Sequence, residues 1–277
     1  MVARHPLRVV IVNYGSCRYI EKQLESGVFD RRDEVVLVDN ASEPAWLSDL
    51  AAAHGATSIL LESNLGFAKA VNIAVRASTT RWPILLLNPD ITLTANDLRE
   101  MLSHLEAKKR EPSPTAVAPL LVDSRDKVQV GAAGGPLTLG SVLRYFWFAS
   151  HIWPNALGVF LTRRQLTRCS DVDWLCMACL LLRPDAFDDY GPIPEDELVY
   201  GEDLAWGTAA TQAGARFKLL PQCRVVHERG GSGGSSRWIG ALERLIRRRM
   251  SMPKARAAII VLRSGLAARR AIGRKVT

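Results

Sequence analysis

The stretch Ile84-Leu85-Leu86-Leu87-Asn88-Pro89-Asp90 carries the strongest fold signal in the chain. Four consecutive large apolar residues are typical of a strand buried on both faces in the middle of a parallel sheet. Pro89 lacks a backbone donor, so we expect the strand to end there. Asp90 would then follow the carboxyl end of a central strand, where open α/β sheets bind ligands and where a carboxylate can hold a divalent cation. Taken alone, the stretch also fits a plain strand followed by a solvated turn.

Strand-like and helical segments alternate around this stretch. Three strand patterns precede it, at residues 7–14, 34–40 and 58–61, with helical segments between them. Such alternation predicts βαβ units with right-handed crossovers. Further strands are expected at 116–122, 172–175, 179–182, 216–220 and 223–227. The sequence therefore predicts an α/β fold with a mostly parallel central sheet flanked by helices.

Polar residues recur where the first four strands end. They are Asn13, Asp39-Asn40, Asn64, and Asn88 with Asp90. Any one of them fits a turn-forming residue. Repeated at four consecutive strands, they indicate a ligand crevice along the carboxyl edge of the sheet. Asp39 is placed to accept hydrogen bonds from a base or ribose, and Asn64 with the following helix amides suits an anion or a polar ring edge.

The composition limits the classes of protein to which the chain can belong. The 277 residues, 48% hydrophobic and 23% charged, are ordinary for one large or two small globular domains. We find no apolar run long enough to predict a transmembrane helix, and residues 1–6 are too short and polar for a signal peptide. Five cysteines, an odd number, are typical of reduced thiols. The predicted location is therefore the cytoplasm.

The net charge of +8 is concentrated at the C-terminus. From Arg237 onward, twelve Lys or Arg residues stand against one acid, whereas residues 1–236 carry a net charge of −3. This distribution argues against a nucleic-acid-binding main domain. We predict a main domain at 1–236 and a basic helical extension at 237–277, with helices at 238–250 and 254–272. Its arginines recur every seven residues, which fits either a solvated face or a peripheral contact with the anionic inner face of the plasma membrane.

Two other regions leave alternatives open. Residues 123–170 include the aromatic run Tyr145-Phe146-Trp147-Phe148, which fits a substrate-facing segment, a membrane-contacting face or an ordinary buried helix. Cys176 and Cys179 form a CxxC pair without a second pair at zinc-like spacing, so buried structural thiols are the favoured interpretation.

Two acids and a histidine further along are candidate site residues. Glu202 and Asp203 begin a predicted helix, where acids serve either as caps or as catalytic groups. His227 ends a predicted strand and precedes the glycine-rich segment 228–236, which has the composition of a lid. A buried, satisfied histidine is the alternative.

Taken together, these motifs resemble the family-2 nucleotide-sugar glycosyltransferases of the GT-A fold, a Rossmann-like architecture, and especially their bacterial rhamnosyltransferase-like branch. The resemblance spans about residues 7–235. Eight segments match in the family's order: Val10–Tyr14, Val36–Ser42, Asn64–Asn72, Leu85–Asp90, Val172–Trp174, Ala178–Leu181, Gly201–Asp203 and Val225–His227.

The resemblance implies a role for each matching residue. The residues assigned to the nucleotide-sugar site are Asn13, Tyr14, Asp39, Asn64, Gly66, Asn72, Asn88, Asp90 and Trp174. Asp39 would contact the base. Asp90 stands at the DxD-type position and would bind Mg²⁺ or Mn²⁺ together with His227. Asp203 would be the general base, and Glu202 would lie on the acceptor side.

The implied activity is an inverting, metal-dependent transfer of a sugar, with rhamnose as a candidate. The donor would be a dTDP- or UDP-sugar, and the acceptor a cell-envelope glycan or a lipid-linked glycan. Met177 stands where the family usually has a small residue near the sugar, which leaves the sugar's identity open. The alternatives are a non-catalytic nucleotide-sugar or lipid-binding module and a nucleotidyltransferase. The latter would need a glycine-rich activation loop after the first strand, which we do not find.

Overall fold

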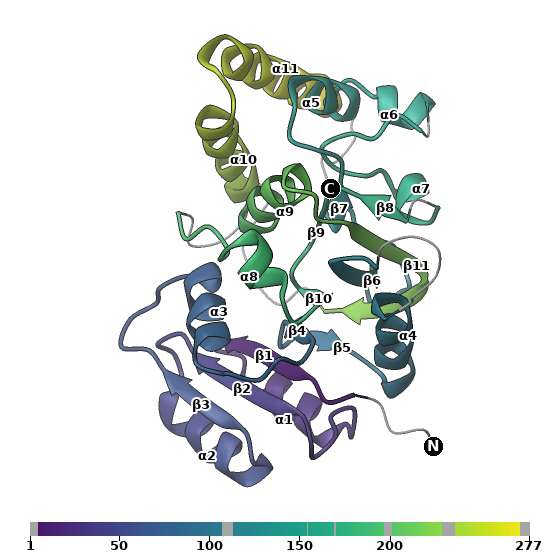
Figure 1. The fold of residues 1–277 in the computed structure, drawn as a ribbon. Coiled ribbons are helices and arrows are strands. Elements are labelled where there is room, and N and C mark those ends of the chain that lie inside the picture. The colour runs from purple at the N-terminus through teal and green to yellow at the C-terminus, as the bar shows by residue number, and fades with distance from the viewer. Residues whose placement is uncertain are drawn as a thin grey trace.

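The computed structural model describes residues 5–106, 113–153, 155–168, 170–196, 201–228 and 236–271. A nine-stranded sheet runs through the molecule, with helices on both of its faces (Figure 1). Its strands are β1 (Arg8–Asn13), β2 (Glu34–Asp39), β3 (Thr57–Leu60), β4 (Ile84–Leu87), β5 (Ile91–Thr92), β6 (Ala116–Val122), β8 (Asp171–Val172), β10 (Cys179–Leu182) and β11 (Phe217–His227). The strand order is β3-β2-β1-β4-β10-β6-β11-β5, and β8 pairs with β11.

The first half of the sheet is parallel. β1 pairs in parallel with β2 and β4, and β2 with β3. The connecting helices are α1 (Cys17–Glu25), α2 (Pro44–His54) and α3 (Phe67–Arg76). β4 is buried along its whole length, as its four apolar residues predict, because it lies between β1 and β10. The predicted βαβ arrangement is confirmed.

The second half of the sheet is mixed. β10 runs antiparallel between β4 and β6, whereas β6 and β11 are parallel. The two strands predicted at 216–220 and 223–227 form one strand, β11, because its pairing with β6 continues past an irregularity between Leu220 and Arg224. Proline at 221 cannot donate to the ladder, which explains why the sequence pattern breaks there.

The remaining elements are the other helices and two short strands outside the nine-stranded sheet. They are α4 (Ala95–Leu105), β7 (Ala133–Gly134), α5 (Leu139–Phe146), α6 (Ala149–Ile152), α7 (Arg163–Leu166), β9 (Trp174–Leu175), α8 (Ala186–Tyr190), α9 (Glu202–Gln212), α10 (Ser236–Arg249) and α11 (Met252–Ala271). Pro253 lies in the first turn of α11, a position where its missing N–H costs no hydrogen bond. None of the helices in these described segments is both long and apolar enough to cross a bilayer.

The C-terminal helices belong to a second hydrophobic core. It joins α10 and α11 to α5 and to the first turn of α9, with Trp174 in contact with them. Gly265 permits a close approach of α11 to α5, since a Cβ there would lie 2.7 Å from the Cβ of Phe146. The basic extension is therefore packed on the rest of the molecule. The division into two domains at residue 236 stays a prediction.

Part of the segment 123–170 forms a buried helix, which is one of the three predicted possibilities. Tyr145 and Phe146 are buried in the second core, as expected for an ordinary buried helix. Trp147 and Trp153 are exposed. The CxxC cysteines are also placed: Cys179 is buried in the main core, where burial raises the pKa of its thiol, and Cys176 packs partly buried against the same core. Structural thiols are thus the interpretation that the packing favours.

A buried arginine joins α11 to α5. Arg269 is 4% exposed, and its Nη2 donates to the Tyr145 carbonyl oxygen at 2.6 Å. The guanidinium carbon lies 4.8 Å from the centroid of the Tyr145 ring and 4.6 Å from that of Phe148. These cation–π contacts are strongest where the cation is desolvated, as it is here.

We therefore expect Arg269→Ala to lower the free energy of unfolding by about 2–4 kcal/mol, through lost ring contacts and an unsatisfied Tyr145 carbonyl. Arg270→Ala, at the exposed neighbouring position, is the matched control and should change it by less than about 0.5 kcal/mol. Urea unfolding followed by circular dichroism measures both. Equal stabilities of the two variants would contradict the role given to Arg269.

Candidate active site

The first polar cluster lies where β1 and β2 end. Asn13 and Asp39 are register partners, so the Asn13 Nδ2 donates to Asp39 Oδ1 at 2.8 Å. The same carboxylate accepts the backbone N–H groups of Ser42 at 2.8 Å and Glu43 at 3.0 Å. Burial opposes ionisation, but these donors together hold the pKa of Asp39 below its usual value. Asp39 is thus an ionised carboxylate that fixes the turn after β2. For Asp39 to contact a nucleotide base, one of these hydrogen-bond donors would have to turn away.

The second polar cluster orders the loop before α3. Asn40 Nδ2 donates to Asn64 Oδ1 at 2.9 Å, and Asn40 Oδ1 accepts the Leu65 N–H at 2.8 Å. Gly66 donates its N–H to Asn64 Oδ1 and has a φ of +84°, which a side chain would strain. Asn64 and Gly66 therefore share one loop beside Asp39's strand. Tyr14, at the end of β1, is exposed to solvent.

Two of the predicted site residues face inward instead. Asn72 is buried and ties α3 to the loop before α9, since its amide exchanges hydrogen bonds of 2.8 and 3.0 Å with the backbone of Ile193. Trp174 is 1% exposed, and its indole N–H donates to the Val159 carbonyl at 2.9 Å. Both side chains therefore stabilise the packing of the fold. Direct contact of either with a donor stays a prediction.

Asp90 and His227 are brought together, as predicted for a metal-binding pair. β5 pairs with β11 so that Ile91 lies opposite His227, and Glu228 donates its N–H to the Asp90 carbonyl at 2.9 Å. As a result, His227 Nε2 lies 3.3 Å from Asp90 Oδ1. Asn88 begins the same turn, and its carbonyl accepts from Gln23 at 2.8 Å.

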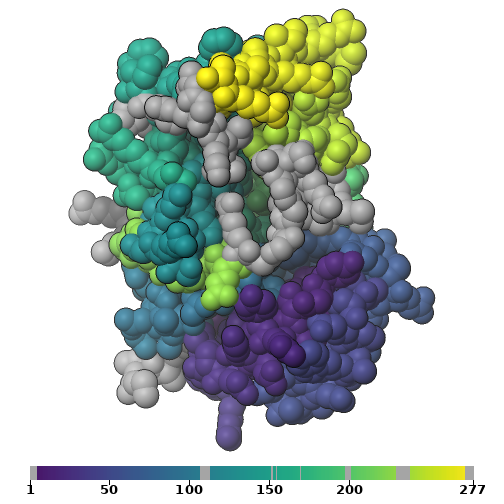
Figure 2. Space-filling view, turned by 180° about the vertical axis from the view of Figure 1, so that it is seen from behind, coloured from purple at the N-terminus to yellow at the C-terminus, as the bar shows by residue number. Residues whose placement is uncertain are grey.

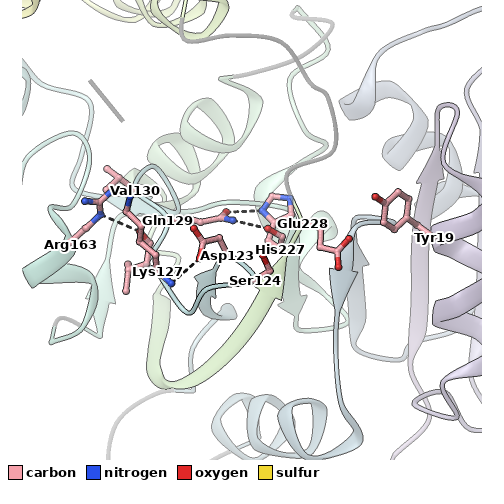
Figure 3. A pocket seen from close by; sticks show the side chains of 10 residues that line it. Tyr19, Asp123, Ser124, Lys127, Gln129, Val130, Arg163, His227 and Glu228 are labelled. Atoms are coloured by element: carbon pink, nitrogen blue, oxygen red, sulfur yellow. Dashed lines mark hydrogen bonds between the residues drawn. The ribbon is translucent and has the colours of Figure 1, made fainter. Parts of the chain in front are cut away.

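Gln129, which the sequence pattern did not single out, fixes the ring of His227 (Figure 3). Its Nε2 donates to the His227 carbonyl at 2.7 Å, so its Oε1 is the acceptor that faces His227 Nδ1 at 2.9 Å. Nδ1 must then carry the ring proton, and Nε2 of a neutral ring presents its lone pair to Asp90. No local motif marks Gln129, because its partner is 98 residues away in the chain.

The donor set of this pair fits a hard divalent cation. An imidazole lone pair and a carboxylate oxygen, 3.3 Å apart, repel each other unless a proton or a cation lies between them. Oxygen and imidazole ligands suit Mg²⁺ or Mn²⁺, with the imidazole favouring Mn²⁺. Within the described residues, no group of three or more His, Cys, Asp or Glu side chains is arranged to bind a metal. Oxygen atoms of a bound molecule or of water would suit the remaining positions around such a cation.

A cleft of about 660 Å³ opens beside His227. It lies at the carboxyl ends of β6 and β11, and Tyr19 of α1 faces Gln129 across it (Figure 3). Lys127 and Arg163 line it together with the acids Asp123 and Glu228, so positive and negative charges are balanced around it. The cleft is therefore polar on the side that carries His227. Met177 does not line it and is buried in the main core.

Asp203 lies in the first turn of α9. Its Oδ1 accepts the Leu204 N–H at 2.7 Å, but burial dominates and raises its pKa to about 6. A carboxylate with such a pKa can accept a proton near neutral pH. Glu202, beside it, lines a smaller cavity of about 180 Å³ together with Arg248 and Arg249 of α10. The glycine-rich segment predicted as a lid lies mostly outside the described residues.

Comparisons with known proteins agree with this architecture. Residues 8–111 match the model of glycosyl transferase family 2. The chain is 28% identical to N-acetylglucosaminyl-diphospho-decaprenol L-rhamnosyltransferase of Mycobacterium tuberculosis, over 82% of this chain and 78% of that protein. It is 23% identical to rhamnosyltransferase WbbL of Escherichia coli, over 79% and 82% of the two chains.

Solved structures show the same fold at low sequence identity. The crystal structure of S. aureus TarS 1–349 matches with a TM-score of 0.58 at 14% identity, over 99% of this chain and 76% of that one. GalNAc-T7, crystallised with UDP, GalNAc and Mn²⁺, matches with a TM-score of 0.57 at 16% identity, over 87% of this chain and 48% of that one.

The fold and the comparisons define a nucleotide-sugar glycosyltransferase with the GT-A fold. The chain is a glycosyltransferase, and its residues 8–111 are similar to glycosyltransferase family 2, as the order of its motifs implied. The nucleotidyltransferase and non-catalytic alternatives receive no support from these comparisons.

The Gln129 contact predicts the ring tautomer of His227. Long-range ¹⁵N–¹H spectra of the metal-free protein should show a proton on Nδ1 of His227. We expect Gln129→Leu to shift the population toward the Nε2–H form, because the acceptor that holds the Nδ1 proton is lost. Gln222→Leu, an exposed glutamine on the same strand, is the matched control. A tautomer that does not respond to Gln129→Leu would contradict this assignment.

Proposed function

We propose that the chain transfers a sugar, with inversion, from a nucleotide-diphospho-sugar to a hydroxyl of a lipid-linked glycan. The observation that carries this proposal is the Asp90–His227 pair, in which Gln129 fixes the His227 ring beside a polar cleft. Such a pair suits the diphosphate of a donor. The carboxyl end of the sheet, with the buried Asn13 and Asp39 and the exposed Asn64, would hold the base and ribose.

In this proposal Asp203 is the general base. It takes the proton of the acceptor hydroxyl as that oxygen forms a bond to the anomeric carbon, and the bond from this carbon to the diphosphate oxygen breaks. Attack opposite to the leaving group inverts the anomeric centre. The pKa of about 6 supports the role, because the carboxylate is ionised at neutral pH yet still basic. Glu202 would contact the acceptor from the adjoining cavity.

The leaving diphosphate needs a counter-charge. Asp90 and His227 would hold Mg²⁺ or Mn²⁺, which supplies charge neutralisation for the departing anion. Lys127 and Arg163 would add positive charge from the wall of the cleft. The GalNAc-T7 structure, which contains Mn²⁺ together with UDP, is consistent with such a requirement.

The names of two relatives suggest the substrates. Both are rhamnosyltransferases, and one acts on N-acetylglucosaminyl-diphospho-decaprenol. We therefore propose a rhamnosyl donor, as the dTDP- or UDP-sugar, and a polyprenyl-diphosphate-linked sugar as acceptor. Such an acceptor would place the enzyme peripherally at the cytoplasmic face of the plasma membrane.

Asp203→Asn tests the base. We expect transfer to fall by about 10²–10⁴-fold, because the amide cannot accept the proton, while nucleotide binding is retained. In the wild type, kcat/KM should fall about tenfold per pH unit below about pH 6, where Asp203 becomes protonated.

Asp188→Asn, an exposed acid on α8, is the matched control and should leave transfer and its pH profile unchanged. Substantial transfer by Asp203→Asn, or an acid limb that stays near pH 4 in the wild type, would refute the assignment of Asp203.

A thermal-shift panel tests donor and metal. The melting temperature should rise with dTDP- or UDP-rhamnose in the presence of Mn²⁺, more than with GDP-sugars, because ligand binding stabilises the folded state. A chelator should abolish the shift, and Gln129→Leu should raise the Mn²⁺ concentration required by about 10–100-fold. No shift with any nucleotide-sugar, at any Mn²⁺ concentration, would contradict the proposed donor site.

A further inference from the structure

The segment that joins α5 to α6 exposes large apolar side chains. Trp147 is 49% exposed, Ile152 66% and Trp153 62%, all within seven consecutive residues. Single exposed apolar residues are ordinary on a protein surface, but a group of this size at one turn usually marks a contact surface.

The turn that presents these side chains is held in place. Phe148, between α5 and α6, has a φ of +64°, a left-handed conformation that a bulky residue adopts only when its surroundings impose it. Its ring lies against the buried guanidinium of Arg269, 4.6 Å from the ring centroid. The projecting segment is therefore fixed to α11.

The exposed face of α11 is basic and apolar. Arg256, Ile260, Arg263 and Arg270 are exposed along one side of the helix, and the opposite side packs in the second core. One of these arginines, Arg263, is paired with Glu243 at 2.8 Å. The helix itself contains no acidic residue.

Basic residues are concentrated in two stretches of the chain. Residues 127–170 and 244–277 contain 16 of the 36 Lys and Arg residues and none of the 28 Asp and Glu residues. The rest of the chain consequently carries a net charge of −8. Six of these sixteen basic residues lie on α5 and α11. The helices α5, α6 and α11 lie at one end of the fold, opposite β1 to β3 and α2 (Figure 1). Figure 2 shows the same separation from behind, with α11 in yellow and the N-terminal part in purple and blue.

We propose that the α5–α6 turn and the exposed face of α11 form one docking surface for an anionic lipid bilayer. Tryptophan side chains insert at the headgroup level, and arginines are attracted by anionic lipids. A second copy of the chain is a poorer occupant, because the two basic surfaces would repel each other. A purely ionic contact with a polyanion would leave Trp147, Ile152 and Trp153 in water.

The docking surface is packed against the catalytic helix. Leu204 and Ala205, which directly follow Asp203, belong to the same core as Tyr145 of α5 and Leu262 of α11. Docking would therefore fix the distance between the first turn of α9 and the bilayer surface. This inference deepens the proposed function and rests on it for the purpose of docking, since a lipid-linked acceptor would lie in that bilayer.

Sedimentation with vesicles tests the surface in the full-length protein. The wild type should bind vesicles of phosphatidylglycerol and phosphatidylcholine and bind phosphatidylcholine alone much more weakly. The double variant Trp147→Ala/Trp153→Ala should lose at least about tenfold in affinity for the anionic vesicles. Arg256→Gln and Arg270→Gln should each lower the affinity for the anionic vesicles about fivefold. Trp46→Ala, an exposed tryptophan of α2 at the opposite end, is the matched control and should bind like the wild type.

Three results would overturn the inference. They are a wild type that ignores anionic vesicles, a double tryptophan variant that binds them as well as the wild type, and a dimer in solution that this variant dissociates. Quenching of tryptophan fluorescence by brominated lipids adds an independent readout, which the double variant should lose.

A water-soluble acceptor with a short lipid chain separates this inference from the proposed function. The double tryptophan variant should transfer to it at the wild-type rate, because docking is not needed. Normal transfer without vesicle binding would refute the docking surface alone. Vesicle binding without transfer to any acceptor would refute the proposed function alone.

Discussion

The short antiparallel pairing of β5 with β11 is the contact on which the candidate active site depends. It places Ile91 opposite His227, and with the Glu228–Asp90 hydrogen bond it sets the imidazole beside the Asp90 carboxylate. The turn before β5 is itself held from α1, because Gln23 donates to the carbonyls of Asn88 and Ile91 at 2.8 and 2.9 Å. The two-residue strand β5 follows β4 closely in the chain and pairs at the edge of the mixed second half, beside β11, whereas β4 and β10 join the two halves of the sheet. The site forms where the two halves meet.

Local patterns in the sequence identified the residues at strand ends, and distance along the chain limited the rest. The apolar run before Asn88 predicted β4, and the polar residues after β1 and β2 predicted the cluster of Asn13 with Asp39. Gln129 was missed because its function depends on a contact 98 residues away. The C-terminal helices were expected as an extension, since an arginine pattern does not reveal that Arg269 is buried against aromatic rings while Arg270 is exposed. Trp174 likewise follows a family motif, yet its ring lies in a core.

The carboxylates of the buried Asp39 and the half-buried Asp203 have opposite electrostatic environments. Asp39 receives hydrogen bonds from several donors, and these outweigh burial and keep its pKa low. Asp203 accepts the Leu204 N–H, but there burial dominates and raises the pKa to about 6. A carboxylate held strongly in the ionised form is a weak base, so Asp39 suits orientation and charge. The assignment of proton transfer to Asp203 follows from this difference as well as from its position on α9.

The second core distinguishes one end of the molecule from the other. It joins α10 and α11, which carry much of the positive charge, to the first turn of α9, whereas the polar clusters of β1 and β2 lie toward the opposite end. In the proposed arrangement a donor would enter from solution at the end of the sheet that holds Asp39. An acceptor would arrive along the lipid surface at the end that holds α11. The two substrates would then meet between the halves, near the Asp90–His227 pair and the base, without competing for one entrance. The exposed arginines of α11, together with the exposed Trp147 and Trp153, favour this second route along the lipid surface.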